Sequence, residues 1–318
     1  MEKEVHIMIL TVTLNPSVDI SYKLEHFAMD SVNRVKDISK TAGGKGLNVS
    51  RVLRQLDQEV VATGFLGGSL GKFIREEIGK IGIGDLFVHS QDATRNCIAV
   101  IHDEGKQTEI LESGPTIKAS EAKVFLKQFQ KALQQAKLVT ISGSLPQGLD
   151  KDFYNDLLRI ANKNNTPVLL DTGGSLLKGA LNYEHKPFLI KPNKAEMADL
   201  VGQDLVNENQ LIEALKNPLF NDVEWVVVTL GSEGGIIKYQ NDIYKASVPK
   251  IKAVNPVGSG DSVIAGFADG LIQNLEPLKL IKHGLSMGVL NALEEKTGYI
   301  DSNKIEWCVE QIEVKKYQ

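Results

Sequence analysis

Short apolar runs separated by longer segments with helical spacing recur along the chain. Segments with helical spacing lie at Glu121–Ala136, Lys151–Asn162 and Asn209–Leu215. Four runs rich in Val, Ile and Leu have the composition of strands buried on both faces: Leu138–Ser142, Pro167–Leu170, Phe188–Ile190 and Trp225–Thr229. Alternation of strands and helices predicts an α/β fold with a doubly wound, mainly parallel sheet and helices on both faces. Ligands bind such sheets at the carboxyl ends of the strands.

Other stretches alternate polar and apolar residues, as do strands with one face covered and one face in water. Ser17–Tyr22 has this pattern, and Asn96–Ile101 and Gln107–Leu111 flank a hairpin turn at Asp103–Lys106. We interpret them as a small antiparallel β-sheet that forms a lid. Its polar face would look into the cleft and its other face would pack on another subunit. An ordinary edge hairpin is the alternative interpretation.

The lid segments divide the chain into two interleaved parts. The prediction assigns residues 1–16, 42–94 and 114–318 to a main domain that binds nucleotide and substrate. Residues 17–41 and 95–113 form the discontinuous lid. The residues before Met8 precede the first apolar run, and we expect them to be an extension without an assigned function.

Composition excludes several classes of protein. Of 318 residues, 42% are apolar and 24% charged, which is ordinary for a globular protein, and the formal net charge is −4. Because no block of Lys or Arg and no apolar run of membrane-spanning length occurs, we expect neither nucleic acid nor a membrane as partner. Cys97 and Cys308 suggest neither a disulfide framework nor a zinc site, which favours a reducing compartment and a cytoplasmic protein.

The motif Asn255–Ser262 combines small residues with the start of a helix. Apolar residues at helical spacing follow it, so the helix should begin near Gly260. Small residues at this entrance would leave the N–H groups of Gly258, Ser259 and Gly260 open, and the helix dipole favours an anion there. The motif therefore predicts a phosphate cradle.

Asp261 lies at this predicted anion site, where a phosphoryl group would repel it. A carboxylate in this place can act as general base on the hydroxyl that accepts the phosphoryl group. The alternative is that Asp261 only caps the helix, a position at which Asp is favoured.

A second glycine motif, Thr41–Val49, also runs into a helix. Gly43 and Gly44 allow close approach of a ligand to the backbone, Lys45 can bind an anion, and Asn48 offers both a donor and an acceptor. This combination suits a polyhydroxylated substrate, and a tight strand-to-helix turn is the alternative. Neither a P-loop nor a dinucleotide-binding fingerprint occurs in the chain, so a nucleoside triphosphate must bind in another way.

Taken together, the two glycine motifs resemble those of the phosphofructokinase-B branch of the ribokinase superfamily. The similarity spans nearly the whole chain. The segments that match family signatures are Thr13–Asp19, the Gly43 motif, Ile141–Pro146, Lys191–Glu196 and Asn255–Asp261. The resemblance implies a ribokinase-like fold, an ATP-dependent sugar-phosphate kinase and, as a further expectation, a homodimer formed through the β lid.

The resemblance also implies roles for residues on the sugar side. Asp261 would be the base, and Gly258, Ser259 and Gly260 would bind the transferring phosphoryl group. Sugar hydroxyls would be bound by Asp19, Gly43, Gly44 and Asn48. Arg95, with Lys45 beside it, would hold the substrate's own phosphate, for which the planar fork of Arg is suited. Ser144 would lie near the sugar or serve as a simple turn residue.

On the nucleotide side, Asn193 and Glu196 match an Asn-x-x-Glu motif that, by the resemblance, helps to place Mg²⁺ and the ATP phosphates, with water between the side chains and the ion. The resemblance implies ATP as co-substrate and the following nucleotide-binding residues: Lys191, Asn193, Glu196, Thr229, Gly231, Gly234 and Asn291. A buried helix over His283–Asn291 would line the adenine site, and the alternative role of Asn291 is structural.

Three segments indicate which substrate the resemblance favours. They are Asn-Pro-Val-Gly-Ser-Gly-Asp, Thr94–Cys97 and Glu294–Gly298. They are most similar to family members that phosphorylate D-tagatose 6-phosphate to the 1,6-bisphosphate in lactose and galactose catabolism. Members that act on fructose 1-phosphate are close behind, and a non-catalytic sugar-phosphate sensor is a remote alternative. Arg34 matches a lid arginine that reaches substrate in some relatives, or it is a solvated charge.

Overall fold

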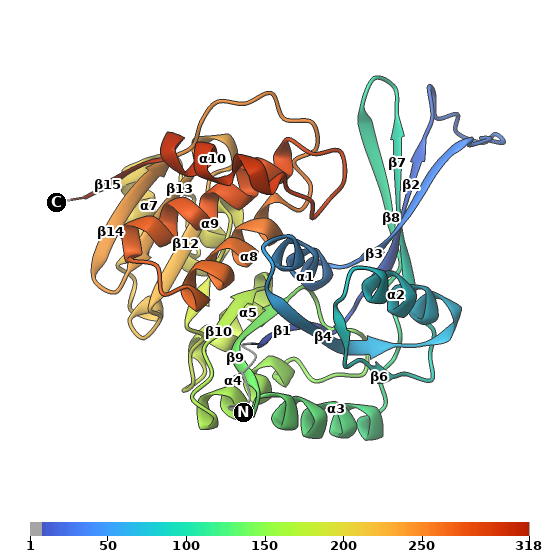
Figure 1. The fold of residues 1–318 in the computed structure, drawn as a ribbon, viewed down its shortest axis with the longest axis horizontal. Helices are drawn as coiled ribbons and strands as arrows, with labels where there is room; N and C mark the ends of the chain where they lie inside the picture. The colour runs from blue at the N-terminus through green and yellow to red at the C-terminus, as the bar shows by residue number, and fades with distance from the viewer. Residues whose placement is uncertain (1–7, 318) are drawn as a thin grey trace, which may run out of the picture.

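The computed structural model describes residues 8–317, so the first seven residues, for which we assigned no function, lie outside the described part. Two sheets of unequal size organise the described chain (Figure 1). The large sheet has 11 strands and the small one has four. The small sheet projects from one end of the large, helix-covered body.

The large sheet is parallel through its centre. In spatial order its main path is β15 (Glu313–Lys316), β14 (Asp242–Ser247), β13 (Gly235–Tyr239), β12 (Trp225–Thr229), β11 (Leu189–Ile190), β10 (Val168–Asp171), β9 (Ala136–Ser142), β1 (Met8–Thr13), β4 (Glu59–Leu66) and β5 (Gly84–Asp85). β6 (Val88–His89) also pairs with β4. Only the strands from β12 outward to β15 pair antiparallel. All four predicted strands of this sheet are present within two residues of their predicted bounds.

Helices cover both faces of this sheet, because each central strand sends alternate apolar side chains to opposite sides. On β1, Leu10 and Val12 join one core and Ile9 joins the other. The first core is covered by α3 (Ala119–Ala132), α4 (Phe153–Lys163), α5 (Gly174–Asn182), α6 (Lys194–Val201) and α7 (Glu208–Leu215). The second is covered by α1 (Lys45–Gln55), α2 (Gly68–Lys80), α8 (Ser259–Ile272), α9 (Pro277–Ala292) and α10 (Ile305–Gln311). The doubly wound α/β prediction is confirmed.

Short 3₁₀ turns occur at Pro218–Phe220, Gly231–Glu233 and Ser302–Lys304. One predicted helix was too long: α3 ends at Ala132, whereas the prediction continued to Ala136. Ala136 instead begins β9 and pairs with Met8 of β1. Pairing with a neighbouring strand therefore overrode the local helical pattern. No helix of residues 8–317 is long and apolar enough to cross a membrane.

The small sheet contains the alternating stretches that were predicted as a lid. Its order is β3 (Asp37–Gly43), β2 (Ser17–Lys23), β7 (Arg95–His102) and β8 (Lys106–Leu111). The prediction of a purely antiparallel sheet was wrong at its centre, because β2 and β7 pair parallel, with Ser17 opposite Arg95. The reason is that both strands enter this sheet from the large one, and both run outward from it (Figure 1).

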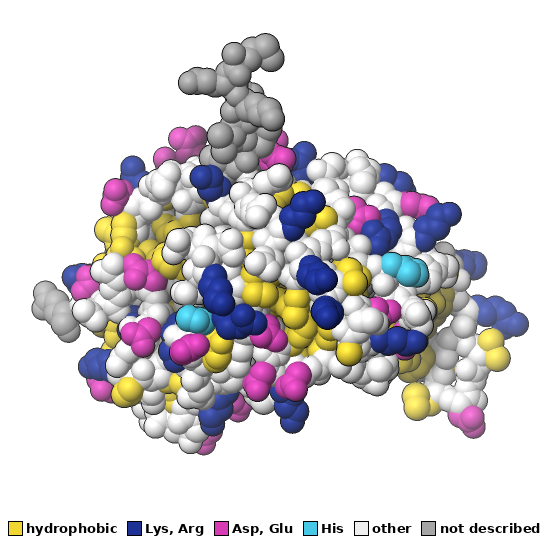
Figure 2. Space-filling model, turned by 90° about the horizontal axis from the view of Figure 1, so that it is seen from below, with side chains coloured by type: hydrophobic (Ala, Val, Ile, Leu, Met, Phe, Trp, Pro, Cys, Tyr) yellow, Lys and Arg dark blue, Asp and Glu magenta, His cyan; other side chains and the backbone are white. Residues whose placement is uncertain are grey.

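Charged side chains are distributed evenly over the underside of the molecule. Figure 2 shows Lys and Arg interspersed with Asp and Glu on this face. Hydrophobic side chains gather in the middle of the same view. This face therefore presents no extended field of one sign.

Candidate active site

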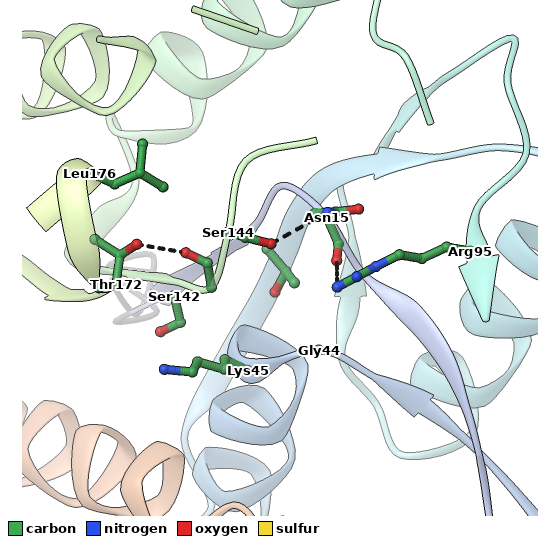
Figure 3. A pocket seen from close by; sticks show the side chains of 11 residues that line it. Asn15, Gly44, Lys45, Arg95, Ser142, Ser144, Thr172 and Leu176 are labelled. Atoms are coloured by element: carbon green, nitrogen blue, oxygen red, sulfur yellow. Dashed lines mark hydrogen bonds between the residues drawn. The ribbon is translucent and has the colours of Figure 1, made fainter. Parts of the chain in front are cut away.

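The carboxyl ends of the parallel strands meet at one edge of the large sheet, where a cavity of about 320 Å³ opens. Because the strands run in the same direction, their polar end residues converge there. The lining residues are Thr13, Asn15, Gly44, Lys45, Arg95, Ser142, Gly143, Ser144, Thr172, Gly173 and Leu176. They come from the ends of β1, β9 and β10, from the starts of α1 and α5 and from β7, and Figure 3 shows how the labelled side chains lie around the cavity.

Several buried polar atoms of this cavity have no hydrogen-bond partner in the described protein. They are Oγ1 of Thr13, Oδ1 of Asn15, Oγ of Ser142 and Nε of Arg95. Buried polar groups are nearly always paired, so a cluster of unpaired ones indicates that a ligand completes it. The set contains three acceptors, two of which are hydroxyls that also donate, and one cationic donor. It fits a ligand that carries both hydroxyl groups and an anionic group.

Arg95 and Ser144 lie on opposite sides of Asn15. The guanidinium of Arg95 donates to the carbonyls of Glu112 (2.8 Å) and Asn15 (3.1 Å). Nδ2 of Asn15 donates to Oγ of Ser144 at 3.4 Å. These contacts fix the guanidinium at the cavity, and its buried Nε–H has no partner in the described protein. Arg34, by contrast, is exposed in the connection between β2 and β3.

The first glycine motif brings Asp19 against the start of α1. A Cβ on Gly43 would lie 2.0 Å from Cγ of Asp19, so only glycine leaves room for this carboxylate. Oγ of Ser17 donates to Oδ1 of Asp19 at 2.6 Å. Burial raises the pKa of Asp19, although this hydrogen bond and two arginines oppose the shift. Gly44 caps α1 with φ of 107°, a left-handed conformation that also favours glycine.

A buried carboxylate, Asp171, holds two lysines below the cavity. Nζ of Lys191 lies 3.4 Å from Oδ1 and Nζ of Lys45 lies 3.5 Å from Oδ2 of Asp171. Burial acts to lower the pKa of Lys45, but the carboxylates of Asp171, Asp261 and Glu196 outweigh it and the pKa is raised. The Lys45 ammonium is therefore charged at neutral pH. Both lysine side chains are positioned to attract an anion.

Asp261 lies next to this lysine pair in the first turn of α8. It is 6% exposed, and Oδ2 accepts a hydrogen bond of 2.8 Å from Nδ2 of Asn48. Burial, helped by the charge of Asp171, raises the pKa of Asp261 to about 7, against the opposing effects of Asn48, Lys45 and Lys191. A carboxylate with a pKa close to the working pH is suited to accept a proton.

The second glycine motif forms the amino end of α8, as predicted. Gly258 has φ of 81° and caps the helix. One predicted donor is unavailable, because the N–H of Ser259 donates to the carbonyl of Pro256 within the tight turn. A side chain on Gly260 would lie 3.0 Å from Nζ of Lys191. The helix terminus and the Lys191 ammonium therefore meet at one point, which favours an anion.

Asn193 and Glu196 form a reciprocal capping box at the start of α6. The backbone N–H of Asn193 donates to Oε2 of Glu196 at 2.8 Å, and the N–H of Glu196 donates to Oδ1 of Asn193 at 2.9 Å. Oε1 of Glu196 points to Gly173 at the cavity wall, because a Cβ on Gly173 would lie 3.2 Å from it. This oxygen remains available for a ligand.

The loop after β12 lies beside this capping box. Thr229 bridges to Asn193, and its N–H donates to the carbonyl of Pro192 at 3.1 Å. Gly231 has open space around it, whereas a Cβ on Gly234 would lie 2.1 Å from the carbonyl oxygen of Ala246. Gly234 is thus required by the packing of β13 against β14. The fold brings the predicted nucleotide residues Lys191 to Gly234 together along one edge.

Asn291 was predicted either to bind nucleotide or to be structural. Its side chain is fully buried; Nδ2 donates to the carbonyl of Val257 (2.9 Å) and to Oγ of Ser259 (3.4 Å), and Oδ1 accepts from the N–H of Gly298 (2.8 Å). These bonds use both amide hydrogens and one of the two lone pairs of Oδ1. They agree with the structural alternative, and the nucleotide-binding role of Asn291 stays a prediction.

The sequence-based predictions missed four of the residues that build the cavity and its floor: Thr13, Asn15, Ser142 and Asp171. All four stand at or just after the ends of parallel strands, which is the signal that could have identified them. Within residues 8–317 no group of three or more His, Cys, Asp or Glu side chains could hold a metal ion by itself.

Comparison with known proteins agrees with this geometry. The family model described as pfkB family carbohydrate kinase matches residues 12–304. A tagatose-6-phosphate kinase of Staphylococcus epidermidis is 48% identical over 308 residues, which cover 96% of this chain and 99% of the relative.

Two solved structures illustrate the similarity of fold. A Thermotoga maritima protein named as a possible 1-phosphofructokinase superposes with a TM-score of 0.89 at 27% identity, covering 98% of this chain and all of that one. Ribokinase of Arabidopsis thaliana, solved with ribose and ATP, gives a TM-score of 0.78 at 19% identity, covering 96% and 98% of the two chains. The latter shows similarity of fold alone.

Proposed function

Because this chain belongs to the pfkB family of carbohydrate kinases, we propose that it transfers the γ-phosphoryl group of ATP to D-tagatose 6-phosphate. The products are D-tagatose 1,6-bisphosphate and ADP. The observation that carries the kinase chemistry is the buried Asp261 at the amino end of α8, bonded to Asn48 and adjoining the two lysines. The substrate follows from the 48% identity to a tagatose-6-phosphate kinase over 96% of the chain.

The sugar phosphate would occupy the cavity at the strand ends. Its phosphate would bind the guanidinium of Arg95 with Lys45 nearby, and its hydroxyls would bind Asp19, Asn48 and Ser144. The unpaired polar atoms of the cavity support this assignment, since sugar hydroxyls supply both donors and acceptors. The backbone at Gly43 and Gly44 would lie against the sugar ring.

In the reaction, Asp261 accepts the proton of the C1 hydroxyl as the oxygen attacks the γ-phosphorus. The new C1 O–P bond forms as the bond from the γ-phosphorus to the bridging oxygen breaks and ADP leaves. Lys191 and the N–H groups of Gly258 and Gly260 would stabilise the charge on the transferring group. Asp261 then releases its proton to solvent.

ATP is the co-substrate of this family, and the capping box at Asn193 and Glu196 with the Thr229–Gly234 loop would hold it. Oε1 of Glu196 is one carboxylate oxygen facing the cavity wall, which fits Mg²⁺, an ion that prefers one or two carboxylates, water and phosphate oxygens. When bound, Mg²⁺ would neutralise charge on the ATP phosphates. Glu196 would hold it directly or through water, with Asn193 beside it.

The small sheet would close over the sugar and exclude water, because a bound water could compete for the γ-phosphoryl group. We also propose that the outer face of this sheet forms a homodimer. Ile38 and Ile110 are about half exposed, and strand register places them on the face opposite Asp19. The free thiols Cys97 and Cys308 fit a reducing compartment, and we propose the cytoplasm.

The test is ADP production with Mg-ATP and, separately, D-tagatose 6-phosphate, fructose 6-phosphate and fructose 1-phosphate. The highest kcat/KM is expected with tagatose 6-phosphate. Preference for fructose 1-phosphate would assign the sister activity, which the fold similarity to the Thermotoga protein favours as second candidate. No turnover on any of the three would contradict the kinase and favour a sugar-phosphate sensor.

The general-base role of Asp261 has its own test. Asp261→Asn should lower kcat by at least about 10²-fold, the usual scale for loss of a general base. Asp269→Asn, two helical turns further along α8, is unsuitable as the control because its carboxylate is fully buried. Asp57→Asn, at the end of α1 and away from the cavity, is the matched control and should turn over normally. Near-normal kcat for Asp261→Asn would overturn this role.

A further inference from the structure

A buried arginine that no proposed step uses lies directly behind the base. Arg51 is 7% exposed on α1. Its guanidinium donates to Oδ1 of Asn48 (3.0 Å), to the carbonyl of Thr297 (3.0 Å) and to the carbonyl of Ala42 (2.6 Å). Its face lies 5.6 Å from the ring centroid of Tyr299. All these partners are uncharged groups.

Burying a guanidinium without a directly paired carboxylate is costly. A neutral glutamine could make part of the same set of bonds without this cost. Burial lowers the pKa of Arg51, whereas Tyr299, Asp19, Asp261 and Glu77 act to raise it. The positive charge thus lies in the field of the sugar-side carboxylate Asp19 and of the proposed base, and this field offsets only part of the cost of burial.

The guanidinium also fixes the orientation of the Asn48 amide. Arginine only donates hydrogen bonds, so the atom of Asn48 that faces it must be the acceptor Oδ1. The amide nitrogen then has to point to the other side, where it donates to Oδ2 of Asp261 at 2.8 Å. Without Arg51 the carboxylate of Asp261 would be the one remaining partner that holds the amide in this orientation.

Arg51 further joins the sugar-side helix to the loop behind the phosphate cradle. Thr297 accepts its hydrogen bond, and Gly298 approaches so closely that a Cβ there would lie 2.7 Å from Nη1. The same loop holds the cradle, because Nδ2 of Asn255 donates to the carbonyl of Glu295 at 3.0 Å. One guanidinium therefore connects segments 246 residues apart in the sequence.

We propose that Arg51 is a positioning residue for phosphoryl transfer, holding Asn48 in the one orientation that donates to Asp261 and keeping α1 in register with the loop behind the cradle. The proposal rests on the proposed function of Asp261 as base. Arg51 does not contact substrate. Its orienting effect on turnover passes through Asn48, its charge acts on Asp261, and each of these two paths has its own test.

The experiment is a double-mutant cycle measured as kcat/KM for the sugar phosphate, with Arg51→Gln, Asn48→Ala and the combined variant. Arg51→Gln is expected to lower kcat/KM by about 10- to 100-fold, with the loss mainly in kcat because no substrate contact is removed. The double variant should be barely worse than Asn48→Ala, since coupled residues are not additive. Additive losses would overturn the proposal.

The matched control is Arg54→Gln on the same helix. Arg54 also donates to two backbone carbonyls, those of Ile81 and Gln58, but far from the cavity. This variant should keep kcat/KM within about twofold of wild type, as expected for a site without coupling to the base. An equal loss in both arginine variants would mean that α1 is simply destabilised, and would overturn the proposal.

A second readout is the acidic limb of the pH profile of kcat/KM, the range in which kcat/KM rises with pH. Asp261 faces Asp171 from β10, Lys191 from the loop after β11, and Lys45 and Arg51 from α1. Arg51→Gln removes a positive charge near Asp261, which should raise the pKa of Asp261 and move the limb to higher pH. Arg51→Lys keeps the charge, so the limb should stay in place and only the orienting hydrogen bonds should be lost. An unmoved limb in the glutamine variant overturns the electrostatic part.

Should Arg51→Gln fail to fold, Arg51→Lys carries the same double-mutant cycle with Asn48→Ala. The proposed function fails in a different way: Asp261→Asn would then keep near-normal kcat, while the coupling between Arg51 and Asn48 could still be measured. Each of the two failures is therefore recognised independently of the other.

Discussion

At the scale of single residues, the site is a set of buried charges that stabilise one another. Asp171 forms ion pairs with two lysines, and its charge also adds to the burial that raises the pKa of Asp261. A pKa shift of this kind lowers the stability of the folded protein, and such shifts cluster at sites where a group takes part in chemistry. Asp261, the proposed base, has such a shift, and in the described chain its one hydrogen-bonding side-chain partner is Asn48.

The raised pKa of Asp261 predicts the pH dependence of the reaction. Below its pKa the carboxyl is protonated and cannot accept the proton of the sugar hydroxyl. We therefore expect kcat/KM to rise with pH through about 7 and to level off above it. The measurement is a pH profile of kcat/KM at constant ionic strength.

The second ionisation of the substrate phosphate, with a pKa of about 6, could produce a similar limb. The residual activity of Asp261→Asn separates the two causes. A limb that belongs to Asp261 disappears in this variant, whereas a limb of the substrate persists. A wild-type limb near pH 4, where an ordinary carboxyl titrates, would contradict the prediction.

At the scale of elements, two helices begin at glycines and meet at the site. α1 begins after Gly44 and α8 after Gly258, both with positive φ. Each helix brings its amino end, its polar side chains and its dipole to the same edge of the sheet. Their mutual packing, which joins Asn48 to Asp261, assembles the base and its partner.

The cap of α8 is predicted to tolerate no side chain. In Gly258→Ala, the left-handed φ of 81° is unfavourable and the new Cβ would lie 2.4 Å from Cγ2 of Thr297. We expect a loss of about 1–3 kcal/mol in the free energy of unfolding from this strain. A drop of at least about tenfold in kcat should accompany it, because a misplaced donor weakens transition-state stabilisation. Urea unfolding and steady-state kinetics measure the two effects.

Gly79→Ala is the matched control for this substitution. Gly79 lies in the last turn of α2, is exposed and has nothing within 4 Å of a Cβ placed on it. Alanine in a helix is favoured over glycine, so this variant should be as stable as wild type or slightly more stable. If Gly258→Ala behaves like Gly79→Ala, the cap geometry is not required.

At the scale of the whole molecule, the small sheet has two unlike faces. Pairs in register point to the same side, so Asp19, Thr41 and Cys97 share one face. Ile110 shares the opposite face with Ile98 of β7. α2 covers this apolar face only near its base, at β2 and β3. The outer part is left as an apolar surface that a second subunit would bury.

The proposed dimer predicts that a charge on this surface shifts the oligomeric state. Ile110 is 55% exposed, and Ile110→Lys would place an ammonium in the interface. We expect wild type to sediment as a dimer at micromolar concentration and Ile110→Lys to shift toward monomer. Val124→Lys is the control, since Val124 is 52% exposed on the distant helix α3. A monomeric wild type would contradict the dimer.

The sequence alone determined the features that depend on neighbouring residues. Apolar runs identified the strands, helical spacing identified most of the crossovers, and glycine followed by an apolar stripe located the starts of α1 and α8. These features could be predicted because periodicity and backbone freedom are local properties. The motifs around Gly43 and Asp261 also sufficed for the resemblance to the kinase family, which the family match confirms.

Only the tertiary structure decided which of these segments meet. The parallel pairing of β2 with β7, the bond between Asn48 and Asp261 and the contact of Arg51 with Thr297 join segments far apart in the chain. It likewise showed that Asp171 lies beneath the cavity and that Asn291 is satisfied by its own backbone neighbours. A local pattern carries no information on such contacts, because they arise from packing of the whole chain around two cores.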